Sequence, residues 1–354
     1  RVGRDPHASS GELNMAELDM SAAFANADIA DHGNHVPGED DWWQESAFFS
    51  LCDPKAGVIG YFRLGRHPNL GVANSYYWTT AETLGLDDKQ FMHGQPLPDG
   101  DVNNTTIAGL TARAIRPMQE YQLTVNGDGY RLEANWQPHF WPIMVHTAVK
   151  GGAGIANKGG HYNALCRVTG YVEKDGQRVA IDAYGFLDHS WGVRKNHFPA
   201  SKWIQAFADP ENFVQCFPVS SVDGAGRFLI GYACRDGKLR QLTNDFETNF
   251  TMREDWITPA ACDARFVDED GRTFHVKGKT VGPESVFPFL HGKFCVHVLA
   301  EFDLDGKPAI GMLENTNPWA IPAIYTDRYG IDERSMWTRA PGEIVDGPGA
   351  TVDG

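Results

Sequence analysis

Asp-Gly dipeptides recur along this chain, and several lie between short runs of β-prone residues. Five of these are at 175–176, 223–224, 236–237, 270–271 and 305–306. A two-residue hairpin turn needs positive φ at its central residues, which Gly adopts freely and Asp tolerates better than most side chains. Each dipeptide therefore predicts a tight turn that joins two antiparallel strands.

A further hairpin is predicted near the start of the chain, where 46–52 and 58–64 are β-prone runs on either side of a Pro/Gly turn at 53–57. Helical periodicity is almost absent, and only 13–27 and 80–91 are candidates for short helices. We therefore expect an all-β, antiparallel chain with few short helices, built as up-and-down meanders.

The length of 354 residues favours two domains over one. We expect two β-barrels or sheets in tandem, because a single large propeller would show a repeat of about 40–50 residues, which is missing. The predicted division is an N-terminal extension, a first β domain, a second β domain and a C-terminal tail, at 1–40, 41–190, 191–330 and 331–354.

Composition narrows the classes of partner. The chain has 46 acidic and 31 basic residues, for a net charge of −15. Without a basic cluster, such a chain binds polyanions poorly, so no nucleic-acid partner is expected. No stretch approaches the roughly 18 apolar residues of a membrane span. The six cysteines lack CxxC spacing, which favours reduced, buried thiols and a cytoplasmic location.

The densest group of chemically active side chains is Asp188, His189, Ser190, Trp191 and Arg194, in a glycine-rich segment. In a regular strand, Asp188 would point to one face and His189 to the other, whereas a bulge could turn both toward one cavity. An Asp in a dry aromatic pocket has a raised pKa and can donate a proton. The alternative is a buried Asp-His-Arg network that holds two domains together.

Glu314 ends an apolar run and is expected to be partly buried, so it needs a partner. One hypothesis makes Glu314 a second acid/base group that faces Asp188. The other makes it the ion-pair partner of Arg194 or Arg167.

No metal site and no cofactor are predicted. The sequence lacks HExxH and zinc-type His/Cys spacing, although His161, His189 and His197 lie near one another. Phosphate-binding glycine loops are also missing, and Ser190 is not in a GxSxG elbow. The many aromatic residues, including ten tryptophans, indicate a hydrophobic small-molecule ligand.

Several segments together carry a family resemblance. They are the early hairpin at 48–50 and 60–65, the segment 161–170, the Asp-His-Ser-Trp-Gly motif at 188–192 and the late segment 311–314. In this order they resemble the bacterial relatives of carotenoid 1,2-hydratase (hydroxyneurosporene synthase). That family shares a tandem lipocalin-like fold with fungal decalin-forming Diels–Alderases. The resemblance covers about residues 42 to 320.

The resemblance implies two lipocalin-like antiparallel β-barrels side by side, with a ligand cavity at or near their junction. It also implies cofactor-independent proton chemistry, such as hydration, isomerisation or cyclisation, on an apolar unsaturated substrate. In this hypothesis Asp188 is the acid, His189 orients or shares its proton, and Trp191 stabilises positive charge. Glu314 is a further catalytic candidate, and Arg194 would contact the catalytic residues without touching the substrate. The substrate-binding candidates are Tyr184, His161, Tyr162, Trp191 and Trp203.

Two other functions remain open. A non-catalytic lipocalin-type carrier would use the same pocket, with Asp188 and His189 as structural residues. A hydrolase would use Ser190 or an activated water. We also expect a homodimer as the form in which the chain works.

Overall fold

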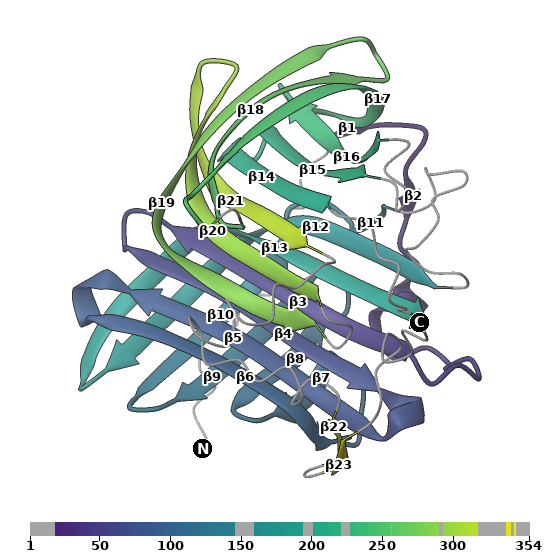
Figure 1. Ribbon diagram of the computed structural model, residues 1–354, viewed down its shortest axis with the longest axis vertical. Coiled ribbons are helices and arrows are strands. Elements are labelled where there is room, and N and C mark those ends of the chain that lie inside the picture. The colour runs from purple at the N-terminus through teal and green to yellow at the C-terminus, as the bar shows by residue number, and fades with distance from the viewer. Residues whose placement is uncertain are drawn as a thin grey trace, which may run out of the picture.

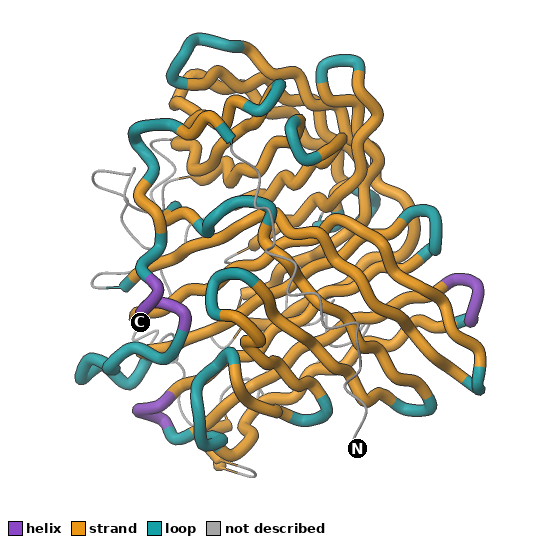
Figure 2. The backbone as a smooth tube through the Cα atoms, turned by 180° about the vertical axis from the view of Figure 1, so that it is seen from behind, coloured by secondary structure: helices purple, strands orange, loops and turns teal. Residues whose placement is uncertain are grey.

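The chain is folded almost entirely into β-strands, and Figure 2 shows helical turns only between them. Within the described residues the helices are three short 3-10 turns, η1 (Ile29–His32), η2 (Pro68–Leu70) and η3 (Glu82–Leu84). None of the helices in this part of the chain is long and apolar enough to cross a membrane. The computed structural model describes residues 18–145, 159–193, 201–220, 227–255, 257–289, 293–317, 338–340 and 343–344.

The first sheet comprises β2 (Ala25–Asn26), β3 (Trp43–Asp53), β4 (Val58–His67), β5 (Val72–Ala81), β6 (Leu86–Pro96), β7 (Asn104–Ile107), β8 (Leu110–Arg116), β9 (Glu120–Gly127), β10 (Tyr130–Pro138), β11 (Ile143–Met144), β12 (Gly160–Lys174) and β13 (Gln177–Val193). Its order is β6-β5-β4-β3-β13-β12-β10-β9-β8-β7, with β11 beside β12 and β2 beside β11. Most neighbours in the chain are thus neighbours in the sheet. The exceptions are that β3 pairs with β13 (Figure 1), that β10 pairs with β12, and that β6 and β7 lie at opposite ends of the order.

The second sheet comprises β1 (Asp19–Met20), β14 (Ser201–Asp209), β15 (Asn212–Ser220), β16 (Arg227–Arg235), β17 (Lys238–Met252), β18 (Pro259–Asp268), β19 (Thr273–Phe289), β20 (Lys293–Leu304) and β21 (Lys307–Asn317). Because β14 pairs with β21 and β17 with β18, β14 to β21 close into a barrel. β13, which ends at Val193, belongs to the first sheet, and the next strand, β14, belongs to the second. β1 pairs with β17 as a parallel strand. A separate small hairpin pairs β22 (Thr338–Ala340) with β23 (Glu343–Ile344).

The Asp-Gly turns explain much of this hairpin topology. Asp175, Asp236 and Asp305 each adopt a φ of 52°, and the glycine after each has a φ between 74° and 83°. Both central residues are therefore in the left-handed region that a two-residue hairpin turn requires. The turn at 270–271 also joins two paired strands, whereas 223–224 lies outside the described residues.

The prediction of a helix in 80–91 is wrong. β5 runs to Ala81, a single 3-10 turn follows, and β6 begins at Leu86. Gly85 has a φ of 57°, so the chain reverses there instead of continuing a helix. In the other candidate segment, 13–27, the residues from 18 onward contain β1 and β2, and 13–17 lie outside the described residues.

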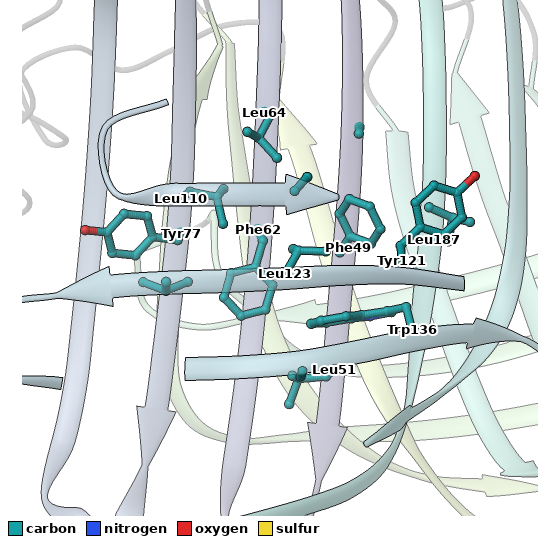
Figure 3. Packing of buried hydrophobic residues seen from close by; sticks show 14 of the residues in the cluster. Phe49, Leu51, Phe62, Leu64, Tyr77, Leu110, Tyr121, Leu123, Trp136 and Leu187 are labelled. Carbon is teal, nitrogen blue, oxygen red and sulfur yellow. The ribbon is translucent and has the colours of Figure 1, made fainter. Parts of the chain in front are cut away.

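The interior of the first barrel is filled by large side chains (Figure 3). The Trp136 ring meets Phe49 and Phe62 edge to face, with centroids 5.6 and 5.8 Å away. Its indole N–H donates to the Ser50 carbonyl oxygen at 2.8 Å, so the buried polar atom is satisfied. Because these side chains occupy the middle of the barrel, the first barrel has a packed core.

The two sheets also pack against each other. Strands β3, β4, β5, β12 and β13 of the first sheet lie beside the second sheet (Figure 1). They share one cluster of buried hydrophobic side chains with β14, β15, β16, β20 and β21. We call this contact the junction. Its buried side chains include Phe48, Tyr61, Tyr76, Trp78, Leu165 and Phe186 from the first sheet and Trp203, Phe207, Phe213, Ile230, Tyr232 and Met312 from the second.

All six cysteines are buried and form no disulfide, which confirms the sequence prediction of buried thiols. Burial raises the pKa of the Cys234 thiol and of the Cys262 thiol to about 12. These two thiols therefore stay protonated at neutral pH.

The closure of the second barrel allows a direct test. A Cβ atom on Gly311 of β21 would lie 2.0 Å from the Gln205 carbonyl oxygen of β14. We expect Gly311→Ala to force these paired strands apart and lower the free energy of unfolding by about 1–3 kcal/mol. Urea denaturation followed by tryptophan fluorescence measures this change. An unchanged midpoint would contradict such a close strand pairing.

Candidate functional site

The segment around Asp188 is a regular stretch of β13, so alternate side chains face opposite ways. Asp188 points to the junction, where it meets His161 of β12. His189 points into the first barrel, where it meets Glu45 of β3. The structure therefore separates Asp188 from His189 and gives each its own partner.

Asp188 and His161 form a buried carboxylate–imidazole pair. The His161 Nε2 atom hydrogen-bonds to the Asp188 Oδ2 atom, and the two side chains are 10% and 11% exposed. Along the sheet, Asp188 lies opposite Asn163 on one side and Phe48 on the other. The pair thus lies on the wall that the first barrel presents to the junction.

The second barrel contributes a matching pair, Glu314 of β21 and His297 of β20. The His297 Nε2 atom lies 2.9 Å from the Glu314 Oε2 atom. The Thr316 hydroxyl donates to the other carboxylate oxygen at 2.5 Å, and the Cys295 thiol donates to that oxygen at 3.6 Å. The His297 Nδ1 atom is buried and has no hydrogen-bond partner among the described residues. This imidazole can therefore exchange a proton with a bound molecule.

Aromatic rings connect the two pairs across the junction. The His297 ring lies 6.1 Å from Phe48, Phe48 lies 5.7 Å from Trp203, and Trp203 stacks on Phe217 at 4.6 Å. Phe217 lies 6.4 Å from the His161 ring. We call these three phenyl and indole rings the aromatic row. It gives the junction an apolar wall with an acid–imidazole pair near each end.

The opposite face of β13 carries a different network. Both the His189 Nε2 atom and the His35 Nδ1 atom hydrogen-bond to Glu45 Oε1, at 2.9 and 2.7 Å. His35 Nε2 also lies 3.2 Å from an Asp31 carboxylate oxygen. The His35 ring stacks on Trp191 with centroids 3.8 Å apart. This network attaches the segment around η1 to β3 and β13.

Electrostatics favour the charged forms of His35 and Glu45. Burial acts to lower the pKa of His35, but hydrogen bonds and attraction to Glu45 and Asp31 outweigh it and raise the pKa. Burial acts to raise the pKa of Glu45, but hydrogen bonds from His189 and His35 lower it. The contact is therefore a charge-assisted one between an imidazolium and a carboxylate.

The predicted site residues divide between these two places. Asp188, His161 and Trp203 lie at the junction with Glu314, and Tyr184 packs half-buried at its edge. His189, Tyr162 and Trp191 lie on the other face of the first sheet, where the Tyr162 hydroxyl is 3.2 Å from His189 Nδ1. Arg194 lies outside the described residues. Ser190 faces the junction side, where its hydroxyl is 3.2 Å from that of Ser46.

Sequence reasoning missed His297, Phe217 and Glu45. Each lies in a strand with ordinary alternation, where a single polar or aromatic residue carries no local signal. Only the pairing of β20 with β21 places His297 beside Glu314. A polar residue at an inward position of a β pattern was the one available hint for His297 and Glu45.

Two groups of side chains could hold a metal ion within the described part of the chain. They are His35, Glu45 and His189, and Cys295, His297 and Glu314, with the donor atoms of each group within 4.8 Å of one another. Imidazole nitrogen, carboxylate oxygen and thiolate sulfur are all zinc ligands. His189 is far in the sequence from His35 and Glu45, so no spacing motif reveals the first group. The absence of a metal site stays a prediction.

The fold and the junction define a class of protein, a tandem pair of lipocalin-like β-barrels with acidic and imidazole side chains buried between them. Residues 28–318 match the family described as "Domain of unknown function (DUF7064)". The chain belongs to this family. No curated protein sequence matches the chain.

Solved structures show the same fold. A structure described as an AttH protein of Nitrosomonas europaea has a TM-score of 0.61 and 15% identity, and covers 82% of this chain and 95% of its own. Kievitone hydratase of Nectria haematococca has a TM-score of 0.56 and 12% identity, covering 86% and 97%. CghA has a TM-score of 0.56 and 11% identity, covering 80% and 94%. At these levels of sequence identity, the comparisons show that the chain shares the tandem two-barrel fold and nothing more.

The Glu45 network predicts a pH-dependent contribution to stability. The pKa of His35 is raised above its ordinary value of 6.5, so His35 contributes its full stabilisation below pH 6.5. That stabilisation is lost as the pH rises through the raised pKa. The lowered pKa of Glu45 stabilises the fold above its ordinary value of 4.5, and this is lost as pH falls through the lowered pKa. The network therefore contributes most between pH 4.5 and 6.5.

We expect Glu45→Gln to lower the free energy of unfolding by about 2 kcal/mol inside that window, and by less at higher pH. Urea unfolding of the variant and of wild type at about pH 5.5 and about pH 8.5 measures the difference. Glu301→Gln, at an exposed position of β20, is the control. A loss that is equal at both pH values would contradict the charge-assisted contact.

Proposed function

We propose that the junction is the active site of a cofactor-independent acid/base enzyme that acts on a hydrophobic, unsaturated small molecule. The reaction is a hydration or dehydration, an isomerisation or a cyclisation. The observation that carries the proposal is the pair of carboxylate–imidazole contacts, Asp188–His161 and Glu314–His297, near the two ends of the aromatic row.

Each pair can move a proton to or from a bound molecule. Asp188 with His161 is our candidate acid for a carbon–carbon double bond. Glu314 accepts a hydrogen bond from His297 Nε2, which leaves Nδ1 to take a proton from water or from carbon. The rings of Phe48 and Trp203 stabilise positive charge that develops on the substrate. In this proposal His189 and Trp191 hold β13 in place from the other face, so His189 is a positioning residue.

Two comparisons support this assignment. Kievitone hydratase, by its name a hydratase, has the same two-barrel fold over 97% of its length. The sequence motifs also resemble those of carotenoid 1,2-hydratase, and two of them, 188–192 and 311–314, contain Asp188 and Glu314.

Substitution of the two carboxylates tests the proposal. Turnover is followed by mass spectrometry as uptake of solvent deuterium or of labelled water oxygen into a panel of unsaturated apolar compounds. We expect Asp188→Asn and Glu314→Gln to lower turnover about 10²–10⁴-fold while ligand binding persists. The control is Asp182→Asn, an exposed carboxylate on the same strand that pairs with Arg167.

Thermal melting must accompany the turnover measurement. If Asp188 only holds the sheets together, Asp188→Asn would cost about 3–5 kcal/mol of stability. A badly destabilised variant, or a stable one with full turnover, would remove Asp188 from the proposed role. Binding of apolar ligands without turnover by wild-type protein would favour the carrier function instead.

A chelator tests independence from metal. Proton transfer by the two pairs requires no Lewis acid, so prolonged dialysis against EDTA is expected to leave turnover and the melting temperature unchanged. Loss of turnover that one divalent cation restores would contradict the proposal. It would direct attention to Cys295, His297 and Glu314, whose donor atoms already lie close together.

A further inference from the structure

The junction contains buried polar atoms that the fold itself does not use. Gln205, Gln215 and Asn163 are 1%, 0% and 0% exposed, and Trp203 is 5% exposed. The side-chain nitrogen of each is buried without a hydrogen-bond partner in the described residues, and so is the Gln215 Oε1 atom. Four donors and one acceptor therefore lie unused in an aromatic environment.

Strand register places these side chains together. Gln205 of β14 lies opposite Gln215 of β15, and Gln215 lies opposite Tyr232 of β16. The Tyr232 hydroxyl crosses the junction and donates to Asn163 Oδ1 at 2.8 Å. Trp203 is two residues before Gln205, so both point to the same face of β14.

The group also adjoins the proposed acid. Asn163 lies directly opposite Asp188 in the pairing of β12 with β13. The Trp203 ring lies 5.4 Å from that of Phe186, two residues before Asp188 on the same face. Opposite residues and next-but-one residues on a sheet face are within reach of one small molecule.

Unpaired polar atoms in a dry environment destabilise a folded protein, because folding removes their hydrogen bonds to water. Leucine or methionine would fill the same space without that cost. Buried amides that have no partner among the residues described by the structure therefore indicate a ligand that supplies the missing partners.

We propose that Gln205, Gln215, Asn163 and Trp203 bind the oxygen atoms of an uncharged carbonyl compound. An excess of donors matches carbonyl oxygens, and the single acceptor matches one hydroxyl group. None of these four side chains carries a positive charge that would balance a buried carboxylate or phosphate. This deepens the proposed function, on which it rests for the site, by naming an oxygenated ligand in place of a pure hydrocarbon.

A carbonyl group changes where charge develops in the proposed hydration, because negative charge on the carbonyl oxygen replaces positive charge on carbon. Donors at a carbonyl oxygen stabilise the negative charge that appears there during conjugate addition. In hydration, the water oxygen bonds to the β carbon and the π electrons move toward the carbonyl oxygen. A base removes one proton from that water, and the acid returns one proton to the α carbon. The sum is the addition of one water, and the reverse sequence removes it.

A matched pair of probes tests the recognition of oxygen. trans-Chalcone and 1,3-diphenylpropene share one carbon skeleton, and only chalcone has the carbonyl oxygen. By tryptophan fluorescence titration we expect wild type to bind chalcone at least about tenfold more tightly. Gln205→Leu and Gln215→Leu should lose this preference and keep the affinity for 1,3-diphenylpropene. Gln122→Leu, on the outer face of β9, should keep the preference.

Thermal stability without ligand gives a second, independent readout. If the two glutamines serve binding, leucine at either position relieves an unpaired buried amide and raises the melting temperature by about 2 °C. If the amides have a structural role, the same variants melt at lower temperature, which overturns the proposal. Equal affinity of wild type for the two probes, or binding of neither, also overturns it.

These outcomes are separable from those of the proposed function. Binding preference and melting temperature are measured without turnover. If Asp188→Asn proves fully active while the glutamine variants lose the preference for chalcone, the acid/base assignment fails and the carbonyl site stands. If Asp188→Asn loses turnover while the glutamine variants keep the preference for chalcone, the carbonyl site fails and the acid/base assignment stands.

Discussion

Burial of aromatic side chains between the two sheets is the interaction on which the rest of the structure depends. Tyr61 and Trp78 of the first sheet are 2% and 0% exposed, and their rings stack with centroids 5.3 Å apart. Tyr61 in turn stacks on His297 of the second sheet at 5.0 Å. Each such ring removes a large apolar area from water. Because Asp188 and Glu314 belong to different sheets, the distance between them depends on this packing.

Two polar networks of opposite character lie on the two faces of β13. In the first barrel, both ring nitrogens of His35 and both of His189 lie within hydrogen-bond distance of a partner. This network is therefore satisfied and stabilises the fold. At the junction, His297 and Gln215 retain buried atoms without a hydrogen-bond partner in the described parts of the chain. The satisfied network supports the strand, and in our proposal the unsatisfied groups hydrogen-bond to a ligand. A protein that binds in its interior gives up stability at such a site.

The sequence predicts features that depend on neighbouring residues, and it does not predict contacts between residues far apart in the chain. The Asp-Gly hairpins were predictable because the positive φ at Asp175 or Asp236 is a property of the turn itself. Strand alternation around Asp188 was equally local. The contact between Glu45 and His189 joins residues 144 positions apart, and no pattern within one strand encodes it. The choice of His161 as the partner of Asp188 likewise depends on the register of β12 and β13.

The parallel pairing of β1 with β17 has a consequence for the time course of folding. Asp19 lies opposite Lys238, so more than half of the chain separates this segment from its partner strand. Ala25, a few residues on, pairs with Met144 of the first sheet. Contacts this distant in sequence form slowly, since closing a long loop precedes any gain from pairing. The segment that contains β1 and β2 is therefore expected to dock after the hairpins of each sheet have formed.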